Sequence, residues 1–311
     1  MDVSRLPLNA LRAFEAAARL GSLTKAGMEL RVGQTAISHQ IKLLEKDLGF
    51  SLFERLPRGI ALTEEALALL PVLTDALRRV SDKVHQLRTG GTAEILTIGV
   101  VSSFALGWLL PRLNDFNARH PQIEVRIKTN NNRADTLLDG LDLFIRFGDG
   151  AWHGTEAVEL MQAPLAPVCS PGLALSVRAP ADLLTQHLLR SYRQDEWPLW
   201  FLTAGLTPPV ARGWIFDNSL ALVEAAAQGL GVALVPAAMF SRDICAGRIV
   251  QPLDVGIVTG AYWMTRLRSR TETSAMVAFK RWIAAELWAE NGGDRVQRRA
   301  PAADTHGQHE S

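Results

Sequence analysis

Apolar side chains in the first ninety residues recur every three or four positions, which is the period of an amphipathic helix. This pattern predicts four helices, over residues 7–20, 23–30, 34–48 and 64–87. Gly21-Ser22 and Val32-Gly33 separate the first three helices, and Gly49 is placed to end the third as a C-terminal cap. The second and third helices, joined by a tight turn, have the pattern of a helix-turn-helix unit.

The third helix of this unit has two distinct faces. We expect one face to be buried: Ala36, Ile37, Ile41 and Leu44. The opposite face carries small polar side chains and one cation: Gln34, Thr35, Ser38, His39 and Lys42. Side chains that donate and accept hydrogen bonds on an exposed helix face suit the major groove of double-stranded DNA. The alternative is a solvated polar face on an ordinary pair of helices, because helix-turn-helix patterns also occur by chance.

Two short apolar stretches after the third helix, residues 52–53 and 60–62, predict a β-hairpin, or wing. Its tip carries Arg55 and Arg58, which would contact phosphate or the minor groove; a solvated loop is the alternative. Residues 1–90 hold 13 Lys and Arg and 10 Asp and Glu, a net charge of +3. The whole chain has 33 basic and 32 acidic residues, so the remainder holds 20 basic and 22 acidic residues, a net charge of −2. Because the N-terminal part is only weakly basic, a few Lys and Arg side chains at specific positions must supply the phosphate contacts. The affinity for DNA should then fall as the salt concentration rises.

The fourth helix is expected to connect two domains. Thr63 is placed as its N-cap, and the acids that follow complement the helix dipole. Its apolar residues keep the three-and-four spacing for over twenty residues, from Leu67 to Leu87, and Pro71 is expected to bend it. A long helix with an apolar stripe between two domains is typical of a dimerisation helix.

Strand-like and helix-like segments alternate behind a short linker at residues 89–92. We expect strands over residues 94–101, 123–128, 141–147, 167–169, 188–192, 214–216, 232–235 and 261–265, and helices from residue 102, over 219–228 and over 272–288. This β-α order predicts largely parallel sheets. Two such sheets with a crevice between them would place a ligand at helix N-termini that face the crevice.

A few polar residues are candidates for ligand contacts in that crevice. Ser102, Ser103 and Ser219 lie where helices follow strands, so they either cap those helices or cap them and also contact a ligand. Tyr262, one of two tyrosines, lies at one end of a strand near the crossing between the sheets, and core packing is its default role. No catalytic set, phosphate-binding loop, dinucleotide fingerprint or metal-ligand spacing is present in the sequence.

Length and composition narrow the class of protein. The 311 residues allow two or three domains, and no run of about 18 apolar residues is present to span a membrane. The N-terminus is amphipathic rather than continuously apolar, so we expect no signal peptide and a cytoplasmic location. The chain has two cysteines, Cys169 and Cys245, so we expect neither a disulfide nor a structural metal site in a cytoplasmic protein. Residues 291–311 are polar and aperiodic, so we expect a disordered tail.

The segment AGMELRVGQTAISHQIKLLEKDLG, with the LFER that follows it, resembles the winged helix-turn-helix of LysR-type transcriptional regulators. The long helix and the α/β part behind it resemble that family's dimerisation helix and two-lobed, periplasmic-binding-protein-like effector domain, so the resemblance covers about residues 7–288. Further segments resemble the AmpR subgroup, which controls inducible β-lactamase genes in Gram-negative bacteria: PLNALRAFEAAARL, NNRADTLLDGLD, IRFGDGAWHGTEA, LLRSYRQDEWPLW, VEAAAQGLGVALVPAAMF and GAYWMTRLRSR.

This resemblance implies a division into domains. Residues 1–63 would form an all-α winged helix-turn-helix and residues 64–90 the linker helix. Residues 91–290 would form the α/β effector domain, with lobe I at about 91–163 and 266–290 and lobe II at about 164–265.

The resemblance also implies a function. The protein would be a homo-oligomer, a dimer of dimers, that binds promoter DNA, acts with RNA polymerase, and has neither enzyme activity nor a cofactor. It would activate or repress a β-lactamase gene, held as a repressor by a UDP-muramoyl pentapeptide and converted to an activator by anhydromuramoyl peptides. A LysR-type regulator of another small metabolite, such as an amino acid, is the alternative. A cytoplasmic solute-binding or enzyme-like α/β protein is a more distant one.

The subgroup's ligand-site positions correspond to Ser103, Ser219 and Tyr262, and its switch-sensitive positions to Ser102 and Asp135. We assign Ser102 to the effector site as well. The sequence departs from the family pattern at three positions. Ser103 stands where Thr is usual, Ser102 where Gly is usual, and Gly33 where Ser or Thr commonly caps the recognition helix.

Overall fold

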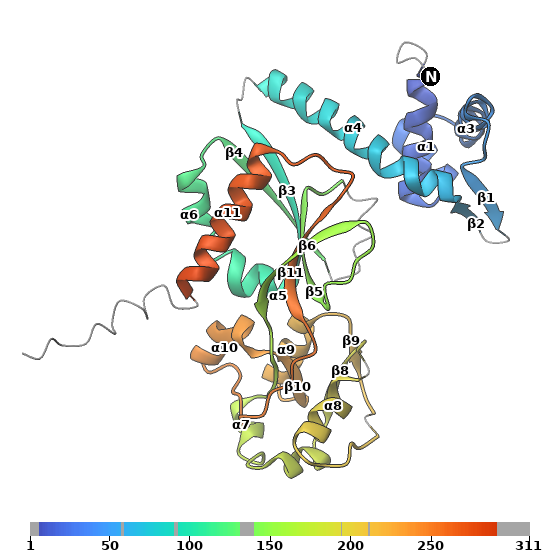
Figure 1. Ribbon diagram of the computed structural model, residues 1–311. Helices are drawn as coiled ribbons and strands as arrows, with labels where there is room; N and C mark the ends of the chain where they lie inside the picture. The colour runs from blue at the N-terminus through green and yellow to red at the C-terminus, as the bar shows by residue number, and fades with distance from the viewer. Residues whose placement is uncertain are drawn as a thin grey trace, which may run out of the picture.

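The N-terminal part of the chain is a helical unit with a small hairpin (Figure 1). The computed structural model describes residues 6–56, 59–89, 93–130, 140–193, 195–210 and 212–290. The N-terminal elements are α1 (Leu8–Leu20), α2 (Leu23–Leu30), α3 (Gln34–Leu48), β1 (Phe53–Leu56) and β2 (Gly59–Leu62). The two strands pair antiparallel, so the expected winged helix-turn-helix is confirmed.

The predicted helix boundaries hold because the caps and the apolar period agree. The Ser22 hydroxyl accepts a 3.3 Å hydrogen bond from the Lys25 amide, and Gly49 ends α3 in the left-handed conformation. Ile37 and Leu44 are buried, as expected. Ala36, however, is exposed, and its inward placement was wrong. At 100° per residue it lies well outside the stripe that Ile37 defines.

The turn between α2 and α3 is close enough to require glycine at one position. A Cβ atom on Gly27 would lie 2.7 Å from the carbonyl oxygen of Val32, a distance that real Cβ atoms do not adopt. Gly27 is therefore needed for the approach of the two helices.

The long helix α4 (Glu64–Thr89) runs from this unit to the α/β part of the chain (Figure 1). The Thr63 hydroxyl caps it, accepting a 3.2 Å hydrogen bond from the Ala66 amide. The helix continues through Pro71, and the bend expected there stays a prediction. Along α4, Leu67, Val80 and Leu87 are exposed, so an apolar surface remains open on the linker helix.

The α/β part forms two lobes, each built on one sheet. The first sheet has the order β4-β3-β5-β11-β6, formed by Ile123–Asn130, Glu94–Val101, Leu143–Gly148, Ala261–Leu267 and Thr155–Gln162. Its helices are α5 (Ser102–Phe104), η2 (Ala105–Leu109), α6 (Leu113–Arg119) and α11 (Ser274–Trp288). The second sheet has the order β7-β10-β8-β9, formed by Leu165–Val168, Val232–Pro236, Leu188–Ser191 and Ile215–Phe216. Its helices are α7 (Pro171–Ala174), η3 (Pro180–Thr185), α8 (Glu196–Thr203), α9 (Ser219–Ala227), η4 (Ala237–Phe240) and α10 (Ser241–Cys245).

Both sheets are mixed rather than largely parallel, and this expectation was wrong. β3 is parallel to β4 and β5, but β11 is antiparallel to both β5 and β6. In the second lobe β10 is parallel to β8 and antiparallel to β7. The reversed strands are β11 in the first sheet and β7 in the second, and each adjoins a place where the chain crosses between lobes, so no helix of the same lobe precedes it to restore the direction. The lobe boundary expected at residues 265–266 falls inside β11.

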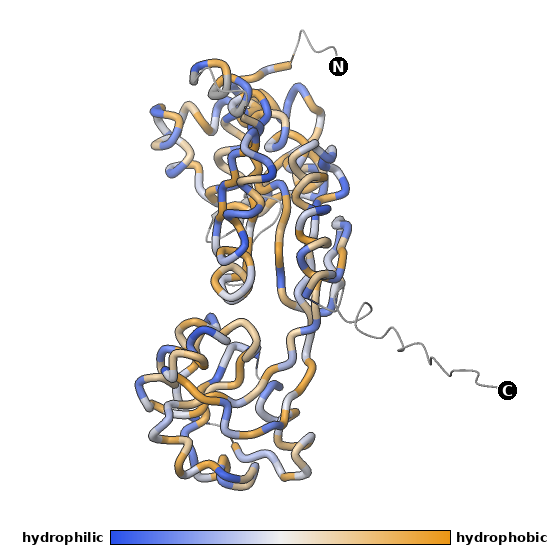
Figure 2. The backbone as a smooth tube through the Cα atoms, turned by 90° about the vertical axis from the view of Figure 1, so that its left-hand side faces the viewer, coloured by the Kyte–Doolittle hydropathy of each residue, from blue (hydrophilic) through white to orange (hydrophobic). Residues whose placement is uncertain are grey.

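The lobes also touch away from these crossings. Figure 2 shows the second lobe below the first, with chain segments passing between them. A Cβ atom on Gly107 of η2 would overlap the carbonyl oxygen of Met239 in η4, so the two backbones are in direct contact at this point. Only glycine permits such an approach.

A buried ion cluster joins α4 to the first lobe. Asp142 is 2% exposed and accepts hydrogen bonds from Arg78 of α4 at 2.8 and 3.2 Å, from Arg270 at 2.6 Å and from the Thr97 amide at 2.7 Å. Asp75 of α4 lies 3.3 Å from the same Arg270 guanidinium. Opposite charges and the four hydrogen bonds to the Asp142 carboxylate make this burial tolerable, and they fix the helix against the sheet.

Among the residues described, no helix is long and apolar enough to cross a membrane.

Candidate functional site

The polar face of α3 is one of two candidate sites. Gln34, Thr35, His39 and Lys42 are exposed, and Ser38 is half-buried on the same helix. The Thr24 hydroxyl donates a 3.2 Å hydrogen bond to Gln34 Oε1, so the side-chain NH₂ group is the donor end of this residue. Gly33 starts the helix without a side-chain cap. The first turn of α3 thus presents backbone and side-chain donors together.

The wing is held to this helix by one carboxylate. Glu45 Oε1 accepts hydrogen bonds from the amides of Leu52 at 2.8 Å and Phe53 at 3.4 Å, so the start of β1 is tied to the last turn of α3. Arg55 lies in β1 opposite Ile60. Arg58 lies outside the described residues. Its phosphate contact stays a prediction, like the DNA contacts of the other residues.

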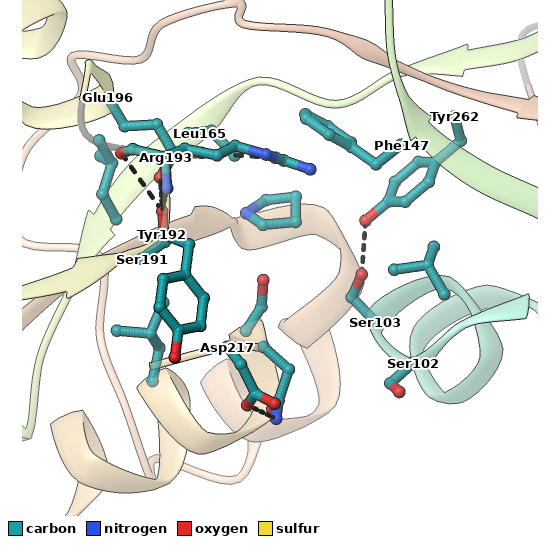
Figure 3. Close-up of a pocket in the computed structure, with 16 residues that line it drawn as sticks. Ser102, Ser103, Phe147, Leu165, Ser191, Tyr192, Arg193, Glu196, Asp217 and Tyr262 are labelled. Carbon is teal, nitrogen blue, oxygen red and sulfur yellow. Dashed lines mark hydrogen bonds and ion pairs between the residues drawn. The ribbon is translucent and has the colours of Figure 1, made fainter. Parts of the chain in front are cut away.

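The second candidate site is a cavity of about 220 Å³ between the lobes (Figure 3). All four of the predicted effector-site residues line it: Ser102, Ser103, Ser219 and Tyr262. They come from α5, α9 and β11, which are far apart in the sequence. The carboxyl ends of the parallel strands β3, β8 and β9 all point at this space, which is where open α/β sheets bind ligands. Asp135 lies outside the described residues.

Ser103 and Tyr262 form a buried pair on the wall of the first lobe. Their hydroxyl groups are 2.9 Å apart and hydrogen-bonded, as the dashed line in Figure 3 shows. The Tyr262 ring packs against Phe104 and Phe147, at centroid distances of 5.0 and 5.5 Å. Burial raises the pKa of Tyr262 far above its usual value, so the phenol stays neutral. Tyr262 is thus both a core residue and a hydrogen-bonding group at the cavity.

The expected capping role of the serines was wrong. Asn218 is the N-cap of α9, and its side-chain oxygen accepts a 2.8 Å hydrogen bond from the Ala221 amide. Asn caps helices as well as Ser does, and it precedes Ser219, which becomes the first helical residue instead. The helix that starts at Ser102 has no side-chain cap. Ser219 is half-buried at the cavity wall, on the opposite lobe from Ser103.

Sequence patterns did not identify the charged residues of the cavity: Arg193, Glu196 and Asp217. Glu196 is 7% exposed and accepts a 2.6 Å hydrogen bond from the Ser191 hydroxyl. Burial raises the pKa of this carboxyl above its usual range. Arg193 and Asp217 follow the carboxyl ends of β8 and β9. That position was the available signal, because ligands bind outside such strand ends.

The described lining of the cavity offers hydroxyl, guanidinium and carboxyl groups on an apolar floor. In the part of the chain that the structure describes, no group of three or more metal-ligating side chains occurs.

Comparison with known families assigns both parts of the chain. Residues 8–67 match the model for the bacterial regulatory helix-turn-helix protein of the lysR family, and residues 89–288 match the LysR substrate binding domain. The chain is 56% identical over 280 residues to the HTH-type transcriptional activator AmpR of Pseudomonas aeruginosa, covering 89% of this chain and 95% of that one. It is 44% identical over 282 residues to a carbapenem-hydrolyzing beta-lactamase transcriptional activator of Enterobacter cloacae, covering 90% and 96%.

Solved structures agree with this assignment. The effector domain of AmpR of Pseudomonas aeruginosa superimposes with a TM-score of 0.62 at 54% identity, covering 67% of this chain and all of that one. The full-length regulator AphB of Vibrio cholerae, at 20% identity and a TM-score of 0.55, covers 89% of this chain and 98% of its own, and it shares the fold. With both halves matched and the winged helix joined to a two-lobed domain, the chain belongs to the LysR family of bacterial transcriptional regulators.

Proposed function

We propose that this LysR-type regulator controls a β-lactamase gene in response to a muramoyl peptide. The observation that supports it most strongly is the combination of high identity to AmpR over both domains with a cavity lined by Ser103, Ser219 and Tyr262. Hydroxyl groups from both lobes suit a ligand rich in hydroxyl and amide groups, since each can donate and accept a hydrogen bond. The buried Ser103–Tyr262 pair would fix their orientation before the ligand arrives.

The DNA-binding part supports this proposal through the polar face of α3. Gln34, Thr35, Ser38 and His39 would contact base edges in the major groove, where side-chain amides and hydroxyls distinguish base pairs. Lys42, Arg55 and Arg58 would contact phosphates, which carry affinity rather than sequence information.

The exposed apolar residues of α4 would be covered by a second copy of the chain. The protein would then act as a dimer of dimers in the cytoplasm, with RNA polymerase as its partner. It would work without a cofactor and without catalysis.

The DNA contacts can be tested with purified protein and its own upstream promoter fragment. Single alanine substitutions at Gln34 and His39 should relax discrimination between the operator and a scrambled site. Lys42→Ala should instead weaken binding to both DNAs and reduce the dependence of log K on log salt by about 1. Lys280→Ala, far from α3 on α11, is the control and should change neither. The division of roles would be wrong if the Gln34 and Lys42 variants behaved alike.

The ligand can be tested by calorimetry with an anhydromuramoyl tripeptide. Ser103→Ala and Tyr262→Phe should each weaken binding by about tenfold, because each removes one hydrogen-bonding hydroxyl. Ser176→Ala, an exposed hydroxyl outside the cavity, is the matched control. Binding of an amino acid in place of the muramoyl peptide would favour the alternative effector. Unchanged affinity in both variants would remove Ser103 and Tyr262 from the site.

A further inference from the structure

The cavity between the lobes has a single source of positive charge in its described lining. Of the side chains that form its wall, Arg193 is the one basic residue, and two carboxyl groups, Glu196 and Asp217, accompany it. A lone cation in a partly enclosed space has a larger effect on ligand choice than one at the surface, because solvent screens it less.

Arg193 extends across the cavity rather than along its own lobe. It follows β8 in the second lobe, but its guanidinium carbon lies 4.2 Å from the centre of the Phe147 ring, which belongs to β5 of the first lobe. Figure 3 shows the side chain extending towards Phe147 and Tyr262. A cation–π contact of this kind does not use the N–H donors, which lie in the guanidinium plane.

Glu196 engages this guanidinium weakly. Glu196 Oε1 is 3.4 Å from Arg193 Nη1, longer than a good charged hydrogen bond, while Glu196 Oε2 is bound to Ser191 at 2.6 Å. Asp217 Oδ1 accepts a 2.7 Å hydrogen bond from the side-chain NH₂ group of Asn218. The Arg193 side chain is 42% exposed, so its charge is not buried away from an incoming group.

We propose that Arg193 is the specificity-determining residue for a carboxylate on the ligand, bound through the paired N–H donors of its guanidinium edge. Arginine matches carboxylate geometry bidentately, and no other described group of the cavity wall carries a positive charge to bind an anion. The ligand class is therefore a peptide or peptide conjugate with a free carboxylate. This inference rests on the proposed function in its choice of a muramoyl peptide. The recognition of an anion rests on the cavity alone.

The test compares two forms of one ligand by calorimetry. The probes are an anhydromuramoyl tripeptide and the same compound with its peptide carboxyl groups converted to amides. Wild-type protein should bind the acid about 10- to 100-fold more tightly, the range expected for hydrogen bonds to a charged group. Arg193→Gln should bind both forms equally, and Arg193→Lys, which keeps the charge without the planar pair of donors, should lie between.

A matched control and a second measurement make each outcome decisive. Arg248→Gln removes an exposed arginine of the same lobe that does not line the cavity, and it should keep the wild-type preference. If Arg193→Gln also keeps that preference, the inference is wrong.

If wild-type protein binds neither muramoyl form, the proposed function fails and a smaller probe decides the inference. N-acetyl-D-alanine should shift the Arg193 Nε–H resonance in a nitrogen-15 spectrum, assigned by its loss in Arg193→Lys, and N-acetyl-D-alaninamide should not. An unmoved resonance with the acid would overturn the role of Arg193.

Discussion

Replacing Asp142 by Asn should destabilise the junction between α4 and the first lobe. Asp142 is 2% exposed and neutralises Arg270, itself 5% exposed, together with Arg78. The substitution keeps the size of the side chain but removes an acid shared by two guanidinium groups, both of which also contact Asp75. Removing one partner of a buried ion pair lowers the free energy of unfolding by about 3–5 kcal/mol, since the remaining charge stays desolvated. For a domain of this size the melting temperature should fall by about 6–20 °C.

Thermal unfolding of the full chain, followed by calorimetry and tryptophan fluorescence, measures this loss. Glu124→Gln is the matched control. It breaks a 2.7 Å pair with Arg126 whose members are both nearly half exposed, and such pairs contribute under about 1 kcal/mol. The double variant Asp142→Asn with Arg270→Met should lose less than the sum of the single variants, because it also removes an unpaired charge. A shift for Asp142→Asn no larger than that of the control would refute the reasoning.

Three further predictions concern other buried contacts. Burial raises the pKa of Glu196, so the native state holds the carboxyl proton more tightly than the unfolded state. The free energy of unfolding should therefore be highest below the unfolded pKa of about 4.3 and should decline as pH rises through the native pKa. Glu196→Gln should flatten this decline in urea titrations between pH 4 and 8, and an unchanged slope would contradict the assignment. Gly27→Ala places a Cβ 2.7 Å from the Val32 carbonyl and should cost about 1–3 kcal/mol in denaturant unfolding of the DNA-binding part; a neutral effect would show that the turn can relax. Tyr262→Phe leaves the buried Ser103 hydroxyl without its partner and should cost about 1–3 kcal/mol in the same assay, whereas equal stability would mean that the bond contributes nothing.

The DNA-binding part could be predicted from sequence nearly to the residue. Its helices are short and amphipathic, and their ends are marked by local caps such as Ser22 and Gly49, so period and capping give the same boundaries. Ala36 was misplaced because a small apolar residue carries little information about which face it occupies. The exposure of such a residue depends on its angle around the helix.

The effector part was less predictable because long-range pairing decides it. β6 is largely polar on its exposed side and was not expected as a strand, although it pairs along its length with β11. The resemblance to the family brought together Ser102, Ser103, Ser219 and Tyr262, which no local pattern connects. Arg193 and Glu196 were missed since a charged pair after a short strand looks like any solvated loop. Only the fold shows that this loop faces a second lobe.

The contact between Gly107 and Met239 has a consequence for genetics. Any side chain at position 107 would push the two backbones apart, and the change would reach the cavity through the spacing of the lobes, without altering a residue of its wall. A selection for variants that respond without inducer should therefore recover position 107 as well as cavity residues. Such alleles would be recognised by an altered response combined with an unchanged set of cavity-lining side chains.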